Sequence, residues 1–187
     1  MPGCNQTLSG LARDCQPNKG GIKEVLITYW DAIASVTITD GKVSAITFAN
    51  ELAPDYFKKY VLRKGMGSMT KTLHKTDGGN TYVTVVINMN WPRMETTKRA
   101  EAAALALNEC MCIVKDANGI YWLVGYSEPV TSQDGAESTT GAANSDTNQY
   151  GVQLGCDEDT YPYEVPANLI DSLLGEEEQE EEEQVQQ

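Results

Sequence analysis

The stretch Thr81-Tyr-Val-Thr-Val-Val-Ile-Asn-Met-Asn-Trp91 is the strongest indication of fold class in this chain. Its apolar side chains recur at every second position, at Val83, Val85, Ile87, Met89 and Trp91. Because side chains alternate between the two faces of a strand, this pattern is typical of a β-strand with one buried face. Pro92 follows directly and ends the strand, since proline lacks the N–H that a sheet ladder requires.

Turn signals before this strand predict a long hairpin. Asp77-Gly78-Gly79 separates it from a preceding strand at Met69–Lys75. Strand character extends further back over Tyr56–Lys64, and Gly65-Met66-Gly67 predicts a bulge or bend between the two stretches. The elongated hairpin therefore spans Phe57–Trp91. Its arms exceed the usual strand length of about 5–6 residues, so part of it is expected to project beyond the core.

Two tighter hairpins flank the long one. Asp40-Gly41 joins Val36–Thr39 to Lys42–Phe48, and Asn118-Gly119 precedes a strand at Ile120–Tyr126. Asp-Gly suits a type I′ turn, because its two central residues need positive φ, and Asn-Gly is again a hairpin turn. The remaining predicted strands are Ile22–Trp30, Cys110–Val114, Tyr150–Leu154 and Tyr161–Val165.

One long helix is predicted over Met94–Asn108, and Pro166–Leu174 is interpreted as a short helix or turn. The pattern assigns the solvent side of the long helix to Glu95, Lys98, Arg99 and Glu101. It assigns the buried side to Ala100, Ala103, Ala104 and Leu107. Strands and helices do not alternate as βαβ units, so we expect a mainly β fold, an antiparallel sandwich or barrel with one flanking α-helix.

The chain divides into an arm, one domain and a tail. Residues 1–21 are rich in Pro, Gly and Asn and predict an N-terminal arm; residues 22–174 form a single β-sandwich domain. Within it, residues 126–149 are Ser-, Thr-, Gly- and Asn-rich and predict a flexible polar loop. Residues 175–187 are an acidic tail expected to be disordered.

Charge is concentrated in that tail. The formal net charge is −13, and seven of the eight residues 176–183 are glutamates. Without them, 20 acidic residues stand against 14 basic ones, a charge of −6. An acidic body repels phosphate, so DNA is expected to pass such a surface without specific binding.

We expect no signal peptide and no membrane anchor, and we expect five free cysteines in a reducing cytoplasm.

Candidate chemistry is sparse. His74, the single histidine, lies on the polar side of a predicted strand, and Cys110 and Cys112 share one strand face as buried small hydrophobes, with a metal site as the alternative. The cluster Asp157-Glu158-Asp159 is interpreted as a solvated acidic turn in preference to a cation site, for which Asp134 and Asp146 are further candidates. We expect no catalytic residue, no cofactor and no metal, and hence no enzyme.

A basic cluster offers the clearest surface for contacts. It comprises Lys58, Lys59, Arg63, Lys64 and Lys71. Lysines of this kind protect an edge strand from aggregation, or they form a charge-complementary contact with an acidic neighbouring copy. The candidate self-assembly residues are Lys58, Arg63, Lys64, Met66, Met69 and Lys71.

The order of elements resembles a known family. An arm, a sandwich with an elongated hairpin, one helix, a short Asn-Gly hairpin and a polar loop, from residue 8 to residue 165, resemble the tail tube (major tail) proteins of long-tailed phages. Four stretches are similar to virion structural proteins of phages of Bacteroidales gut bacteria, namely Leu8–Cys15, Gly20–Val25, Arg93–Arg99 and Val114–Trp122.

This resemblance implies a virion protein made in the bacterial host cytoplasm. Copies would form hexameric rings that stack into a tube for genome ejection, with an inner sheet lining the channel and other tail or neck proteins as partners. The same fold also implies an alternative, a neck, collar, connector or capsid-associated subunit. A further alternative is a ligand-binding β-sandwich that uses Trp30, Trp91 and Trp122 as platforms.

Overall fold

The computed structural model describes residues 10–12, 15 and 17–175, which form two sheets and two helices. The seven-stranded sheet has the order β2 (Ile33–Thr39), β3 (Lys42–Phe48), β11 (Glu164–Val165), β8 (Tyr121–Val124), β7 (Cys110–Asp116), β1 (Ile22–Tyr29) and β4 (Lys58–Val61). The four-stranded sheet has the order β5 (Gly67–Lys75), β6 (Thr81–Pro92), β10 (Gln149–Glu158) and β9 (Thr131–Ser132). The helices are α1 (Thr96–Leu107) and α2 (Ala167–Leu173), and a 3-10 turn, η1 (Trp30–Ala32), links β1 to β2.

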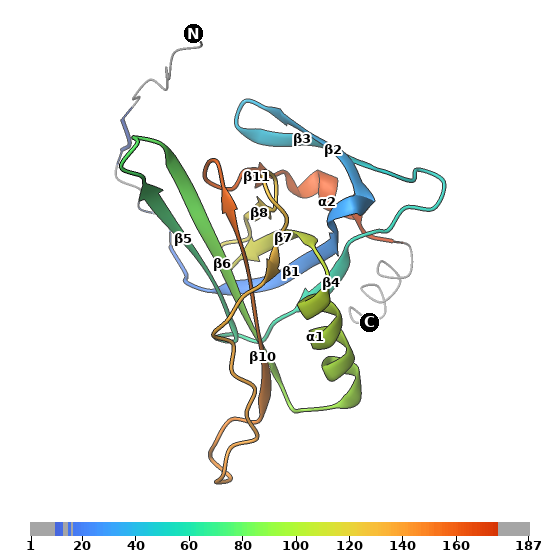
Figure 1. The fold of residues 1–187 in the computed structure, drawn as a ribbon, viewed down its shortest axis with the longest axis vertical. Helices are drawn as coiled ribbons and strands as arrows, with labels where there is room; N and C mark the ends of the chain where they lie inside the picture. Colours follow the sequence, from blue (N-terminus) through green and yellow to red (C-terminus); the bar gives the residue numbers. More distant parts are fainter. Residues whose placement is uncertain (1–9, 13–14, 16, 176–187) are drawn as a thin grey trace.

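The predicted fold class is confirmed. Most strand pairs are antiparallel, with β11 and β3 pairing in parallel. At the first tight hairpin, Asp40 and Gly41 have φ of 52° and 76°, as a type I′ turn requires. In Figure 1 the long strands β5, β6 and β10 cross the other sheet, with the β5–β6 turn at one end and the 133–148 segment at the other.

The first core lies between the two sheets. The alternating apolar residues of β6 (Val83 to Trp91) face inward and pack against Val25 and Ile27 of β1 and Cys112 and Val114 of β7. The period-2 pattern of β6 thus provides one wall of this core, and its other side chains face away from it.

A second core covers the opposite face of the seven-stranded sheet. Leu26 of β1 and Ile113 of β7 pack there with Phe57 and with Ile170 and Leu173 of α2. The central strands are therefore buried on both faces, which explains their nearly continuous apolar sequences, Cys110–Val114 in β7 for example. The segment interpreted as a short helix or turn at 166–174 covers this second core as α2.

The long hairpin is shorter than predicted. It consists of β5 and β6 and closes where the Thr76 N–H donates to the Asn80 carbonyl. The residues before Gly65 do not extend it, because β4 pairs with β1 in the other sheet. Gly67 lies where the chain crosses between sheets, and a Cβ there would stand 2.6 Å from Leu62 Cδ1 and 2.7 Å from Ile22 Cγ1. The glycines therefore mark a change of sheet and not a bend within one strand.

The predicted buried side of the long helix is wrong. Ala100, Ala103 and Ala104 are exposed, and Leu107 is 86% exposed. The side that packs on the sheets instead carries Leu105, which is 5% exposed, and Ala102. An alanine side chain gains little from burial because it is a single methyl group, so the alanine run was compatible with either side. The position of one large residue decided the orientation.

The predicted arm and tail are described only in part, whereas the 126–149 segment is described throughout. Positions 1–9, 13, 14 and 16 of the predicted arm, and the acidic tail from residue 176, lie outside the described residues. Asn18 and Lys19 contact Asn118 in the β7–β8 turn through hydrogen bonds of 3.0 and 2.9 Å. In the 126–149 segment, Val130 is buried and β9 adds to the four-stranded sheet.

Candidate self-assembly surface

Strand β5 presents its backbone along one border of the four-stranded sheet. The Thr76 N–H donates to the Asn80 carbonyl, and the Asn90 N–H donates to the Met66 carbonyl. Hydrogen-bonded and non-hydrogen-bonded residue pairs alternate along two antiparallel strands. The even-numbered residues of β5 therefore bond to β6, and the odd-numbered ones direct their N–H and C=O groups away from it. Among the described residues β5 is the last strand on that side, and Leu73 is 54% exposed on it.

The outer face of the four-stranded sheet is polar and bears little charge. Its side chains come from the even-numbered residues of β5 and β6 and the odd-numbered residues of β10. Examples are Thr70, Thr72, Thr84, Asn88, Asn90 and Gln153. In these three strands no outward position carries Lys or Arg. Asp157 is the outward carboxylate of these strands and accepts a 2.6 Å hydrogen bond from Thr84 Oγ1. Glu128 lines a hollow beside it, and the Glu137 backbone packs over Gly151.

Two of the candidate assembly residues point the other way. Met69 packs against the core between the sheets, and Lys71 places Nζ 3.9 Å from the centroid of the Trp122 ring. Desolvation lowers the pKa of Lys71, while the nearby Asp116 opposes that shift. A half-buried ammonium over an indole face is a cation–π contact inside the subunit. Met69 and Lys71 thus join the two sheets of one chain.

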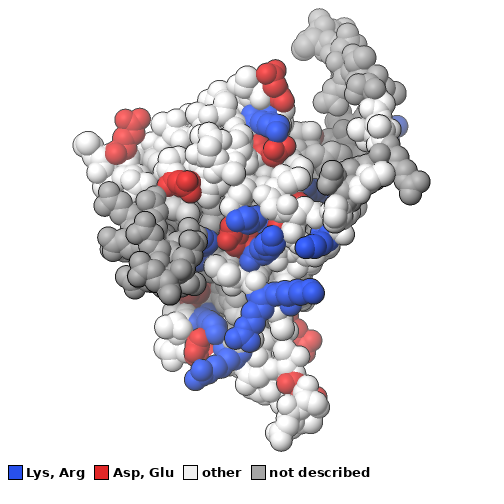
Figure 2. Space-filling view, turned by 180° about the vertical axis from the view of Figure 1, so that it is seen from behind, with Lys and Arg blue, Asp and Glu red and all other residues white. Residues whose placement is uncertain are grey.

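The other four candidates lie on β4 and in the connection between β4 and β5. Lys58, Arg63 and Lys64 are exposed, and Met66 is partly buried where its N–H donates to the Arg63 carbonyl. Figure 2 shows Lys and Arg side chains gathered across the middle and lower part of one face of the molecule. The exposed basic candidates thus lie on β4 and in the turn after it, whereas the outward positions of β5, β6 and β10 carry no Lys or Arg.

The helix region adds basic residues that the sequence reasoning missed. Arg63, Arg93 and Lys98 line one surface hollow of about 420 Å³. Lys98 Nζ is bound to Glu95 Oε1 at 2.6 Å and to the Pro92 carbonyl at 2.8 Å. Arg93 and Lys98 stand far from Arg63 in sequence, and only the packing of the chain brings the three together.

A second hollow lies between β1, β4 and α1. It has a volume of about 470 Å³ and is lined by Thr28, Lys58, Tyr60 and Glu101 among others. Tyr60 Oη donates to Glu101 Oε2 at 2.7 Å, and its ring stacks on Trp91 at 5.7 Å between centroids. Burial, followed by this hydrogen bond, raises the pKa of Tyr60. The phenol therefore stays neutral and links α1 to β4.

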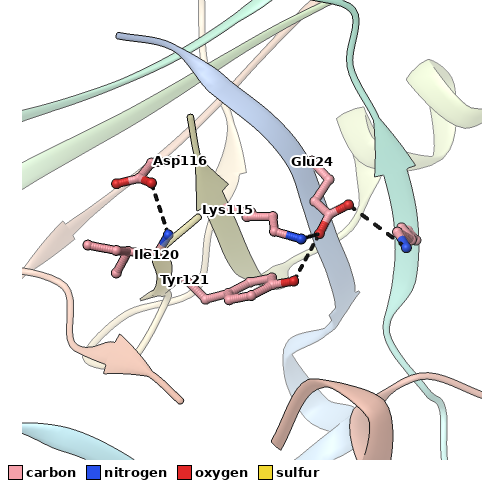
Figure 3. Close-up of polar contacts among 6 residues, drawn as sticks. Glu24, Lys115, Asp116, Ile120 and Tyr121 are labelled. Atoms are coloured by element: carbon pink, nitrogen blue, oxygen red, sulfur yellow. Dashed lines mark hydrogen bonds and ion pairs between the residues drawn. The ribbon is translucent and has the colours of Figure 1, made fainter. Parts of the chain in front are cut away.

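A buried carboxylate organises the central strands (Figure 3). Glu24 of β1 accepts hydrogen bonds from Lys115 Nζ at 2.8 Å and from Tyr121 Oη at 3.1 Å, and Lys59 Nζ lies 3.8 Å away. Desolvation lowers the pKa of Lys115, but the bonds to Glu24 and Tyr121 outweigh it and the net shift is upward. The group is fully paired and so stabilises the register of four adjacent strands.

The acidic turn at 157–159 is not wholly solvated. Glu158 is buried, and its carboxylate accepts hydrogen bonds from the backbone N–H groups of Gly125, Tyr126 and Ser127 at 2.6, 2.9 and 2.8 Å. The prediction of a solvated turn is therefore wrong for Glu158. Its oxygens hold the start of the 126–149 segment to the end of β10, because three backbone donors there need a common acceptor.

Three of the cysteines and the histidine make packing contacts within the chain. Cys110, Cys112 and Cys156 are buried in the first core, and burial raises the pKa of each thiol, for Cys156 to about 12. His74 stacks on Tyr82 at 4.8 Å. Within residues 10–12, 15 and 17–175, no three His, Cys, Asp or Glu side chains are grouped so as to hold a metal ion.

The tryptophans make intramolecular contacts. Trp91 is 6% exposed, Trp122 lies under Lys71, and Trp30 packs against the second core. Trp30 and Trp122 are partly exposed, so the platform hypothesis stays a prediction.

Asp134 lies in an exposed stretch, and Asp146 caps the Ala142 and Ala143 N–H groups, which lowers its pKa.

Comparisons of the chain with models of protein families, with curated proteins and with solved structures gave no match. Among the helices in the described part of the chain, none is long and apolar enough to cross a membrane.

Proposed function

We propose that this protein is a structural subunit of a phage tail that self-assembles into hexameric rings, which stack into the tube through which DNA passes. The four-stranded sheet lines the channel, and neighbouring subunits in a ring join their four-stranded sheets side by side. The protein in this proposal is not an enzyme, and its principal partner is a further copy of itself.

The outer face of β5, β6 and β10 is the observation that carries the proposal. Its threonine, asparagine and glutamine side chains, with Asp157 and no Lys or Arg, offer phosphate groups no cation. Affinity for DNA backbone depends on Lys and Arg that displace counterions, so DNA would slide along such a face. The exposed basic candidates lie instead on β4 and in the turn after it.

The border of this sheet supports the contact between subunits. Strand β5 directs alternate backbone groups outward over nine residues, and an open strand edge of that length either aggregates or pairs with a defined neighbour. A head-to-tail contact that repeats by rotation closes into a ring. The β5–β6 turn and the 133–148 segment extend at opposite ends of the sheet (Figure 1) and are suited to stacking between rings.

Leu73 allows a direct test of the proposed edge. Its N–H faces away from β6, so Leu73→Pro removes one edge donor and preserves the β5–β6 bonds, as proline on an outer edge does. Purified wild-type protein at high concentration is expected to form rings and tubes in negative-stain images. Leu73→Pro is expected to remain monomeric, whereas Leu73→Ala, which keeps the amide, still assembles.

Thermal unfolding of the three proteins checks that Leu73→Pro is folded. Monomers of the wild type at every concentration would contradict the proposal, as would tubes of Leu73→Pro. Rings that never stack would favour the neck or connector alternative, because those parts of a virion are single rings.

A further inference from the structure

The last described residues pair with the border of the seven-stranded sheet. The Phe57 N–H donates to the Leu173 carbonyl at 3.0 Å, and Phe57 and Leu174 form a parallel bridge. Gly175 is buried, and a Cβ on it would stand 3.2 Å from Tyr56 Cδ2. The chain therefore reaches residue 176 directly beside the start of β4, running in the same direction as β4.

The pairing lies on the side of β4 that faces away from β1. The Leu62 N–H donates to the Lys23 carbonyl, so residues 58, 60 and 62 direct their backbone groups toward β1. Residues 57, 59 and 61 direct theirs to the opposite side, where Phe57 already bonds to Leu173. In the described part of the chain, β4 is the last strand on that side of its sheet.

Continuation of this register past Gly175 would bring the glutamate run beside β4. In a parallel pair, one residue donates to the residue before its partner and accepts from the residue after it. With Leu174 opposite Phe57, the same register would bring Glu176 opposite Lys59 and Glu178 opposite Val61. Three further residues span roughly 10 Å, enough to reach the end of β4.

Charge on β4 and the following turn complements these residues. Lys58, Arg63 and Lys64 are exposed along the path, whereas the Lys59 ammonium is already paired with Glu24. Glutamate has low strand propensity and consecutive carboxylates repel each other. Pairing of this run therefore depends on the lysines and arginine beside it.

We propose that the start of the acidic tail, residues 176–178, adds to β4 as a parallel outer strand and closes that border of the sheet against other copies. The docking is intramolecular, because the Phe57 N–H of the same chain already bonds to the Leu173 carbonyl. It concerns a single chain in dilute solution, so it stands or fails separately from ring formation.

Two proline variants of the full chain test the proposed pairing. In this register the Glu177 N–H faces β4 and the Glu178 N–H faces away. Glu177→Pro removes a donor to the Lys59 carbonyl, whereas Glu178→Pro removes the same charge and no bond to β4. The readout is hydrogen exchange of the Val61 amide at neutral pH, which we expect to be slow in the wild type and in Glu178→Pro. It should be faster by roughly tenfold or more in Glu177→Pro.

Salt provides an independent check. In 1 M NaCl the Debye length falls to about 3 Å, so exchange at Val61 in the wild type should accelerate. Equal exchange in the wild type and both variants would overturn the proposal, and so would an equal loss of protection in both variants. Protection that grows with protein concentration would also overturn it, since the strand would then come from a second copy.

Discussion

Among individual residues, Glu158 shows how a carboxylate in an acidic turn becomes a structural group. Its neighbour Asp157 is exposed and bonds to Thr84, while Glu158 is buried with three backbone donors. Alternation along β10 places the two on opposite faces of the sheet. Adjacent acidic residues therefore contribute very differently to stability.

We expect Glu158→Ala to lower the free energy of unfolding by roughly 3 kcal/mol, because the N–H groups of Gly125, Tyr126 and Ser127 lose their acceptor. Asp157→Ala is the matched control, and a surface change of that kind stays within about 0.5 kcal/mol. Urea unfolding of both variants measures the difference. Equal losses would show that the buried acceptor has no special role.

The Cys156 thiol makes stability depend on alkaline pH. Burial, followed by the carboxylate of Glu158, raises its pKa from 9.0 to about 12. In the unfolded chain the thiol ionises near pH 9, so between pH 9 and pH 12 the unfolded state binds fewer protons than the folded state. The contribution of Cys156 is therefore complete below pH 9 and is lost as the pH rises through that window.

Urea unfolding at a series of pH values measures this effect. The free energy of unfolding should fall more steeply from pH 9 to pH 12 in the wild type than in Cys156→Ala, in which the group is absent. Other lysines and tyrosines titrate in both proteins and cancel in the comparison. Parallel curves would contradict a buried, neutral thiol.

Among the secondary-structure elements, helix α1 depends on one residue for its orientation. Leu105 is 5% exposed and Leu107 is 86% exposed, although both lie in the last turns of the same helix. We expect Leu105→Ala to cost roughly 2–5 kcal/mol through lost burial and a cavity. Leu107→Ala should change stability by less than about 0.5 kcal/mol.

Thermal and urea unfolding of the two leucine variants gives the comparison directly. The same substitution at two neighbouring positions keeps helix propensity constant, so a difference reports packing alone. A larger loss at Leu107 would restore the side of the helix that the alanine pattern predicted.

For the molecule as a whole, net charge should control the proposed assembly. A charge of −13 repels neighbouring copies, and seven of those charges lie in residues 176–183. The Debye length falls from about 10 Å at 0.1 M salt to about 3 Å at 1 M, so assembly should accelerate as salt rises. Replacing the seven glutamates by glutamine should weaken that dependence.

Light scattering during assembly at several salt concentrations measures the lag before rings and tubes form. Unchanged kinetics after the glutamate replacements would mean that the tail has no part in delaying polymerisation. Lys75→Gln, which removes one exposed charge outside the tail, shows whether the loss of any single charge changes the lag in the same way.

Local sequence patterns were sufficient to predict the fold class and most strands. Alternation in β6 gives a strand with one buried face, and Asp40-Gly41 and Asn118-Gly119 require tight hairpins, because these signals arise within a few residues. The basic residues Lys58, Arg63 and Lys64 were recognisable as a cluster for the same local reason. How they would be arranged around a sheet border was not.

Long-range packing, in contrast, settles how the sheets divide and what each face carries. The assignment of β4 and β5 to different sheets, the inward direction of Lys71 and the burial of Glu158 all depend on groups that are distant in sequence. The same holds for the bridge between Phe57 and Leu174. Local preference determines whether a segment is a strand, whereas the free energy of burial, summed over the whole chain, determines which strand lies beside it.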